Sequence, residues 1–305
     1  MRFFYLVISF FSFLHATIHP ISFSIPEEKI VSFIPQKEWD FAPLIPGDYS
    51  TYIYKDEATY RKDYQRSYYA YTKIKGGADC MRHYDILASG CIPYFEDLQN
   101  VHPMTMTHFP KELVWEAMHL PGVSPGMIDH SIFDKQRYFE ILEKLLKYTR
   151  EHLTCRKMAQ YLLEKIGNPD PKRVLFLSSC QTQDYLRDSL YIGFRQLLGE
   201  KCDFFSKIDV LYQDCKIPDE KLKFSTIKIL SPRVEISKKQ MIKNIDQGLY
   251  DVIIVGSIHR INLFLFKRLA RRDVRYICVC GEDFHNCCFK QEACLFVREY
   301  TSVLH

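Results

Sequence analysis

The chain lacks the concentrated positive charge that a nucleic-acid-binding surface needs, because its 305 residues carry a formal net charge of only +4. Its densest basic run, residues 267–272, stands where a helix is expected to end, and the helix dipole favours cations there. With 47% hydrophobic and 26% charged residues, and with no fixed-period repeat, the composition excludes disordered and fibrous proteins. We therefore expect a globular protein with no nucleic-acid partner.

Several motifs of known chemistry are also missing. The sequence has no P-loop, no G-x-S-x-G nucleophile elbow and no D-x-D in a loop suited to metal binding. Residues 278–288 hold four cysteines and one histidine, which are zinc-ligand types, but they contain no C-x-x-C pair. Cys278 and Cys280 belong to an apolar, strand-like run, and Cys287 and Cys288 are adjacent. We therefore expect no metal site.

Only the N-terminus has an apolar run of the kind found in targeting segments. Arg2 supplies a short positive region, residues 3–14 are uncharged, and Ala16 is suited to end a cleavage site. The run is too short to span a membrane comfortably. We predict a cleaved signal peptide in residues 1–16, with an uncleaved anchor or an apolar N-terminal strand as the alternatives.

The location of the protein follows from two opposing signals. A signal peptide or anchor implies the secretory pathway or the cell envelope, with membrane association through the N-terminus if the anchor is kept. The eleven cysteines argue the other way, because their number is odd. Several of them, including Cys91 and Cys278, lie in apolar runs where a reduced thiol packs as a small hydrophobic group. A cytoplasmic location therefore stays open.

The first half of the chain, residues 17–167, is expected to mix helices and strands. The spacing of apolar residues predicts helices at 56–72, 79–89, 109–120 and 131–166, and strands at 29–34 and 91–95. Four tyrosines in the first of these helices recur at helical spacing and are expected to face the core: Tyr60, Tyr64, Tyr68 and Tyr71. A glycine and two prolines in "IGNPDPK" end this half.

The second half, residues 172–305, alternates between predicted strands and helices. The strands are expected at 173–179, 225–230, 251–257 and 275–281, and the helices at 184–198, 238–247 and 261–271. This order implies right-handed βαβ units and a doubly wound sheet. The predicted fold class is α/β, with two Rossmann-like domains built on parallel sheets.

The stretch "KGGADCMRHYDILASGCIPYF", which begins at residue 75, carries the strongest functional pattern. Gly76 and Gly77 have no side chain, so a ligand can approach their backbone closely. Asp79 is placed to cap the helix that follows. Arg82 and Asp85 fall on one helix face at a spacing of three.

This arrangement suits a nucleotide. Backbone amides at a helix start and the Arg82 guanidinium bind a diphosphate well, and the Asp85 carboxylate can accept hydrogen bonds from a ribose diol. The alternative is that Arg82 and Asp85 pair with each other on a solvated surface, where such pairs contribute little. The pattern alone leaves both interpretations open.

A resemblance bears on this choice. "RHYDILASGCIPYF" resembles the donor-binding segment of glycosyltransferases with two Rossmann-like domains (the GT-B architecture), and its wider context is similar to exostosin-like enzymes. In that family an acidic residue at the position of Asp85 holds the ribose of a nucleotide-sugar. The family usually has Glu there, and many members have a further acidic residue where this chain has Gly77.

The second half shows a weaker resemblance to the acceptor-side domain of such enzymes, in "RVLFLSSCQTQDYLRDSLYIGFRQLLG" and "YDVIIVGSIHR". The donor-type half therefore precedes the acceptor-type half, which reverses the usual order. The resemblance implies a metal-independent glycosyltransferase that needs no cofactor besides its nucleotide-sugar co-substrate. The expected acceptor is a hydroxyl of a glycan, lipid or protein.

Such a transfer needs a base for the acceptor hydroxyl proton. Asp283 and His259 are the candidates, because both follow predicted strands of a parallel sheet, whose carboxyl ends commonly carry active sites. The alternative function is a non-catalytic, glycosyltransferase-like protein that binds a glycan or a partner. The reversed order of the two halves favours that alternative, as does Gly77, which stands where many family members have an acidic residue.

Overall fold

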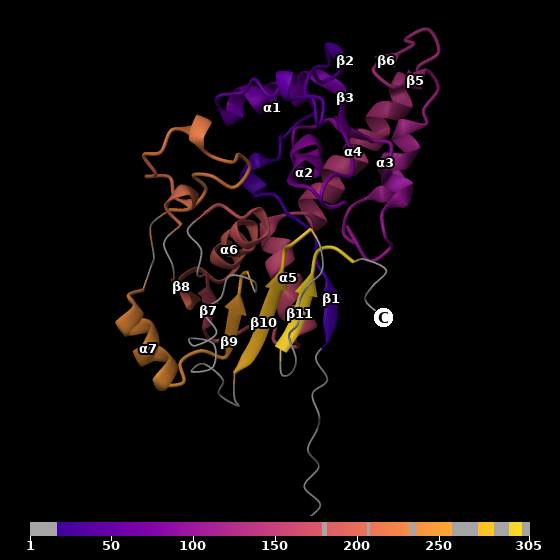
Figure 1. The fold of residues 1–305 in the computed structure, drawn as a ribbon. Helices are drawn as coiled ribbons and strands as arrows, with labels where there is room; N and C mark the ends of the chain where they lie inside the picture. The colour runs from indigo at the N-terminus through magenta and orange to yellow at the C-terminus, as the bar shows by residue number, and fades with distance from the viewer. Residues whose placement is uncertain are drawn as a thin grey trace, which may run out of the picture.

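The computed structural model describes residues 17–178, 182–205, 208–231, 233, 236–257, 274–283 and 293–300. Its helices are α1 (Glu57–Arg66), α2 (Met81–Ala88), α3 (Lys111–Met118), α4 (Lys135–His152), α5 (Cys155–Lys165), α6 (Tyr185–Leu198) and α7 (Lys238–Asp246). Its strands are β1 (Ile18–Pro20), β2 (Trp39–Phe41), β3 (Ser67–Thr72), β4 (Ile92–Phe95), β5 (Val123–Ser124), β6 (Met127–Ile128), β7 (Val174–Leu177), β8 (Cys202–Phe205), β9 (Val252–Val255), β10 (Arg275–Cys280) and β11 (Ala293–Val297). Figure 1 shows their arrangement.

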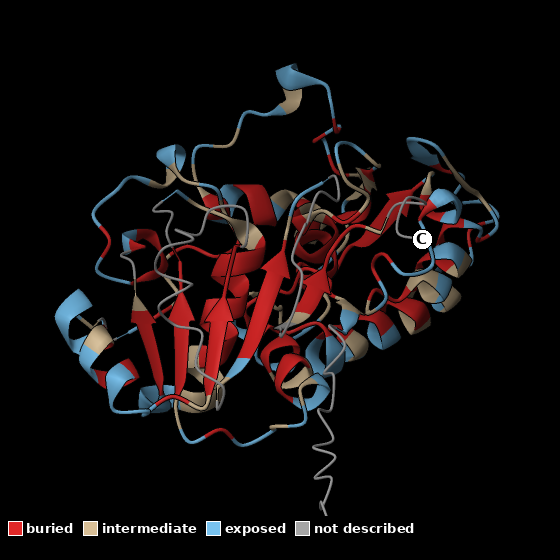
Figure 2. Cartoon of the chain, turned by 60° about the horizontal axis from the view of Figure 1, so that its bottom comes forward, coloured by how far each residue is buried: buried red, intermediate tan, exposed pale blue. Residues whose placement is uncertain are grey.

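The larger sheet confirms the α/β class. It has six strands in the order β1-β11-β10-β9-β7-β8, and every neighbouring pair is parallel. Its interior strands β7 and β9 are buried along their whole length, as expected for a sheet covered on both faces (Figure 2). The predicted strands at 173–179, 251–257 and 275–281 correspond to β7, β9 and β10.

The smaller parallel sheet belongs to the first half and has the order β2-β3-β4. Strand β1 comes from the same half of the sequence but pairs with β11, with Ile18 opposite Leu295. The N-terminal strand therefore completes the edge of the larger sheet. It joins the two ends of the described chain within one sheet.

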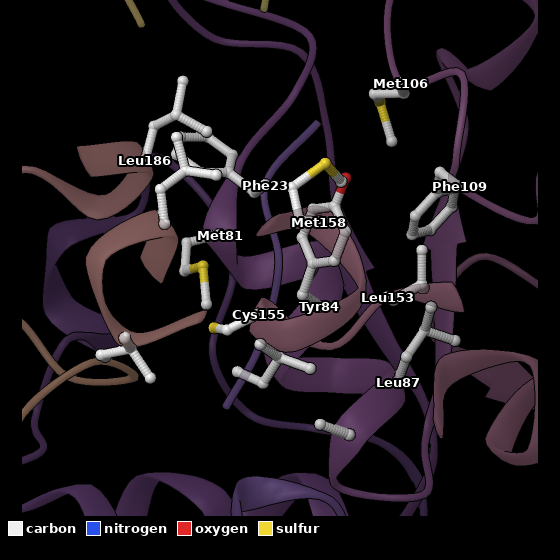
Figure 3. Packing of buried hydrophobic residues seen from close by; sticks show 14 of the residues in the cluster. Phe23, Met81, Tyr84, Leu87, Met106, Phe109, Leu153, Cys155, Met158 and Leu186 are labelled. Atoms are coloured by element: carbon white, nitrogen blue, oxygen red, sulfur yellow. The ribbon is translucent and has the colours of Figure 1, made fainter. Parts of the chain in front are cut away.

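The two halves also share one hydrophobic core. Met81 and Tyr84 of α2, Cys155 of α5 and Leu186 of α6 are all buried in the same cluster (Figure 3). Helices α5 and α6 lie so close together that a Cβ on Gly193 would overlap the carbonyl of Cys155. Because α5 precedes the predicted boundary at 166–172 and α6 follows it, apolar packing continues across that boundary.

Two predictions in the first half are wrong. The helix expected at 56–72 ends at Arg66, and the remaining residues form β3. The run "SYYAYT" is rich in tyrosine, which favours strands, and both faces of β3 are covered. The strand expected at 29–34 is also absent, since that segment contains the end of a 3₁₀ helix (Glu27–Lys29).

Two corrections apply to the second half. The strand expected at 225–230 does not form, because Ser225 and Lys228 have positive φ angles of 79° and 56°, which extended strands do not accommodate. Instead β8, which was not predicted, forms the edge of the sheet beside β7. The predicted helix at 261–271 and the predicted signal segment at 1–16 lie outside the described residues.

The helices predicted elsewhere are confirmed with small shifts of their ends. The long helical stretch at 131–166 is two helices, α4 and α5, and the Thr154 hydroxyl caps α5 through the Lys157 amide at 3.3 Å. No described helix has both the length and the apolar character that a membrane span requires.

Candidate functional site

The candidate site lies where the carboxyl ends of the two parallel sheets meet. The loop after β3 contacts the segments that follow β10 and β11. The loop after β4 joins them, because Thr105 Oγ1 accepts a 2.9 Å hydrogen bond from the Tyr300 amide. Carboxyl ends of parallel strands are the usual position of sites in α/β proteins.

Glycine is required at positions 76 and 77 because side chains of the second half leave no room for a Cβ there. A Cβ on Gly76 would overlap the Asp283 carboxylate. A Cβ on Gly77 would lie 2.6 Å from Glu299 Oε1, closer than real Cβ atoms approach. The structure therefore brings together three of the predicted site residues, Gly76, Gly77 and Asp283. The carboxylates of Asp283 and Glu299 occupy the space beside the glycines.

Glu299 binds the amides of this loop. Its Oε1 accepts a 2.8 Å hydrogen bond from the Asp79 amide and a 2.6 Å hydrogen bond from Arg298. Burial raises the pKa of Glu299 to about 7, although the Arg298 charge opposes this shift. The loop before α2 thus holds the carboxyl group of Glu299 through the Asp79 amide.

Arg298 links the two sheets. Its guanidinium donates to the carbonyl of Asp79 at 2.5 Å, to the carbonyl of Gly281 at 2.9 Å, and to Asp283. It also lies 4.8 Å from the centre of the Phe23 ring. Every face of this buried cation is therefore in contact with protein groups.

The predicted cap on α2 is wrong. Asp79 instead accepts hydrogen bonds of 2.8 Å from the Phe23 amide and 2.9 Å from the Tyr84 hydroxyl. Cys80 is the residue at the helix start, and its side chain makes no capping bond. Burial raises the pKa of Asp79 to about 6. Its role is to tie α2 to the chain after β1.

Asp85 lies in a second buried cluster. Only 3% of its surface is exposed, and it accepts hydrogen bonds from Ser225 Oγ at 2.8 Å and the Tyr60 hydroxyl at 3.2 Å. Its ion pair, at 3.5 Å, is with Arg61. Burial raises the pKa of Asp85 to about 6. The surface pair of Asp85 with Arg82, considered from the sequence, does not form.

Arg82 points to a different partner. Its guanidinium donates to the Tyr52 hydroxyl at 2.9 Å, and Lys75 Nζ donates to the same oxygen at 3.0 Å. No carboxylate of the described residues lies within 4.0 Å of the nitrogen atoms of either cation. Among the residues that the structure describes, Arg82 therefore has no ion pair that compensates its charge.

The remaining predicted residues are placed as follows. Asp283 is 50% exposed and pairs with Arg298. His259 lies outside the described residues. In the part of the chain that the structure describes, no group of three or more His, Cys, Asp or Glu side chains is arranged to hold a metal ion.

Three residues of this region were missed in the sequence: Arg298, Glu299 and Tyr52. The first two directly follow β11, so the rule that selected Asp283 would have selected them had the strand "ACLFV" been recognised. Tyr52 carries no such signal, because it lies in an irregular segment far from α2 in sequence.

Comparison of the chain with protein-family models, with curated proteins and with solved structures found no match. The interpretation of the site therefore rests on its geometry and chemistry.

Proposed function

We propose that the protein is a glycosyltransferase that moves a sugar from a nucleotide-sugar donor to an acceptor hydroxyl, with two Rossmann-like units of GT-B type. The observation that carries the proposal is the position of Arg82. It stands at the start of α2, beside the glycine loop that meets the carboxyl edge of the larger sheet, and it has no carboxylate partner among the described residues. A donor diphosphate is the anion that such a cation would bind.

The transfer assigns one role to each group. The acceptor oxygen bonds to the anomeric carbon while the bond from that carbon to the diphosphate oxygen breaks, and the diphosphate leaves with the electron pair. Arg82 offsets the charge that develops on the diphosphate. Asp283, half exposed at the end of β10, takes the hydroxyl proton.

Asp85 has a positioning role in this proposal. Its carboxylate already has Arg61, Tyr60 and Ser225 as partners, so its contribution is to fix α2 against α1. A ribose would reach Asp85 only after displacing these groups. The proposal therefore differs from the resemblance at this residue.

The test is a thermal-shift and calorimetric screen of the full chain against UDP, GDP, ADP, CMP and their sugars, followed by an assay of donor turnover. We expect one nucleotide to stabilise the protein, and Arg82→Gln to lower turnover more than donor affinity. The control is Arg137→Gln, which removes a surface guanidinium of α4 that pairs with Glu116 of α3 and Glu140 of α4. Failure of every nucleotide to bind the folded protein would refute the proposal.

A second candidate function is a non-catalytic binding protein. The observation in its favour is that Asp283 and Glu299 fill the space next to Gly76 and Gly77, where a donor would come closest to the backbone. A folded protein that binds no nucleotide, or that binds one without turnover of any donor, would support this candidate, whose ligand would be a glycan or a partner.

A further inference from the structure

The surface outside the glycine loop holds two cations that converge on one oxygen. Lys75 Nζ and the Arg82 guanidinium both donate to the Tyr52 hydroxyl, at 3.0 and 2.9 Å. They also lie 5.5 and 5.8 Å from the centre of the Tyr52 ring. Because like charges repel, such a pair is unfavourable unless an anion offsets it.

In the described part of the chain, no carboxylate supplies that anion. The described residues place no Asp or Glu oxygen within 4.0 Å of either cation, and Asp85, one turn along α2, is paired with Arg61. The two cations act on the phenol instead. Desolvation alone would raise the pKa of Tyr52, but the hydrogen bond from Lys75 and the charge of Arg82 outweigh it and lower the pKa.

We infer that Tyr52, Lys75 and Arg82 form a phosphate-binding subsite in which the Tyr52 hydroxyl holds the position of a phosphoryl oxygen. Arg provides a planar set of donors that matches phosphate, and Lys adds a compact charge. Tyr52 is 40% exposed, so an incoming anion can reach the shared oxygen from solvent. The ligand class is a diphosphate.

A neighbouring aromatic ring extends the subsite. Tyr49 is 86% exposed, and its ring centre lies 5.9 Å from that of Tyr52. The turn that carries it is ordered by Asp48, whose side chain accepts from the Ser50 amide at 3.0 Å, and by the Thr51 hydroxyl, which donates to the Asp48 carbonyl at 2.7 Å. A fixed, exposed ring beside a phosphate site is suited to stacking on a nucleobase.

A nucleoside diphosphate is therefore the ligand that this surface fits. This identification of the base rests on the proposed function, whereas the phosphate subsite does not. The two can be separated by measuring inorganic pyrophosphate, which has no base and no sugar, alongside UDP and uridine.

Calorimetric titration of the full chain with pyrophosphate tests the subsite. We expect Lys75→Gln and Arg82→Gln each to weaken pyrophosphate binding by about tenfold or more, since each removes one charged hydrogen bond. Lys62→Gln on α1, an exposed lysine, and Arg137→Gln on α4 are the matched controls and should bind as the wild type does. No binding by the wild type, or equal binding by all variants, would overturn the inference.

Two further variants test the parts played by the tyrosines. Tyr52→Phe removes the oxygen that competes with phosphate and should strengthen pyrophosphate binding severalfold; unchanged or weaker binding would show that the hydroxyl does not hold a phosphoryl position. Tyr49→Ala should weaken UDP binding by about tenfold without changing pyrophosphate binding. Equal affinity of Tyr49→Ala for UDP would remove the stacking role.

The outcomes distinguish the subsite from the proposed function. Pyrophosphate binding that depends on Lys75 and Arg82, without turnover of any nucleotide-sugar, would keep the subsite and reject the glycosyltransferase. Turnover that is the same in Lys75→Gln and Arg82→Gln would keep the glycosyltransferase and reject the subsite.

Discussion

Glu299 accepts a 2.8 Å hydrogen bond from the backbone amide of Asp79, a residue 220 positions earlier in the chain. This bond joins the carboxyl end of β11 to the loop before α2, so it fixes the two sheets against each other. It also buries the Glu299 carboxyl group, and burial disfavours its charged form. The stability of this contact should therefore depend on the protonation of Glu299.

Glu299→Gln should change how stability depends on pH. Burial raises the pKa of Glu299 to about 7 from an ordinary value of 4.5. Between these values the folded protein binds the proton more tightly than the unfolded chain, so the stability from this group is complete below pH 4.5 and is lost as pH rises to 7. Glutamine does not titrate and should lack this loss.

Urea unfolding of the wild type and Glu299→Gln at pH 5 and pH 8 measures the effect. From pH 5 to pH 8, the free energy of unfolding of the wild type relative to the variant should fall by about 1 kcal/mol or more. One pKa unit is worth about 1.4 kcal/mol. Glu282→Gln, which removes an exposed carboxylate nearby, is the control. Parallel pH curves for the wild type and Glu299→Gln would contradict this account.

Gly76→Ala should destabilise the fold. Removal of the Asp283 carboxylate should abolish most of this loss of stability. The added Cβ would overlap that carboxylate, and overpacking typically costs about 1–3 kcal/mol. In the Asp283→Ala variant the space beside Gly76 is open, so adding Gly76→Ala should reduce the free energy of unfolding only slightly. Unfolding of the two single variants and the double variant gives the coupling between these residues.

The double variant Gly76→Ala/Asp283→Ala also bears on catalysis. It should remain folded and bind nucleotide, because the steric conflict is gone, yet fail to transfer sugar, because the proposed base is missing. Additive losses in the two single variants would show that Gly76 and Asp283 do not touch in solution. Normal transfer by the double variant would assign the base to another residue.

Three neighbouring strands of the larger sheet, β7, β9 and β10, could be predicted from the sequence, because they are short apolar runs. Asp184 caps α6 through the Arg187 amide, and Gly199 ends it with a φ of 57°, both local signals. By contrast, β3 was not predicted, because the spacing of its tyrosines fits both a helix and a strand. Local signals thus predicted a helix or a strand correctly where the residues favoured only one type of secondary structure.

The candidate site was predicted less well, because its contacts join distant segments. Helical spacing placed Arg82 and Asp85 on one face of α2, but it could not show that Asp85 is buried while Arg82 bonds to Tyr52. Asp85 meets Arg61, 24 residues before it, and Ser225, 140 residues after it. Sequence spacing carries no information on such partners, so it revealed neither the buried network of Asp85 nor the absence of the alternative surface pair with Arg82.

Asp85→Ala should therefore destabilise the protein rather than only weaken ligand binding. The change leaves the Arg61 guanidinium, which is 7% exposed, without its carboxylate, and breaking a buried ion pair in this way costs about 3–5 kcal/mol. Ser225→Ala removes one hydrogen bond to the same carboxylate and should cost about 1 kcal/mol. Thermal unfolding measures both.

Glu96→Ala, which removes an exposed carboxylate just after β4, is the control for the Asp85 variant and should unfold as the wild type does. Wild-type stability of Asp85→Ala together with weaker nucleotide binding would restore the direct ribose contact that the family resemblance implies. A large loss of stability in Arg82→Gln would instead show that Arg82, too, has a structural role.

His83 should give the opposite pH dependence to Glu299. Its Nε2 donates to the carbonyl of Ala78 at 2.9 Å, so its Nδ1 accepts from the Thr72 hydroxyl at 2.8 Å. Burial lowers its pKa to about 4 from 6.5. The unfolded chain therefore binds the proton first, and the stability from His83 is present above pH 6.5 and lost as pH falls to 4.

His83→Gln should lack this loss of stability at low pH. His119→Gln, which changes an exposed histidine at the C-terminal end of α3, should retain it. When the pH is lowered from 8 to 5, the wild type should lose stability relative to His83→Gln and gain stability relative to Glu299→Gln. Unfolding curves of the three proteins at both values test this opposition directly. A shift of the same sign in both comparisons would mean that one of the two side chains is not buried as the structure places it.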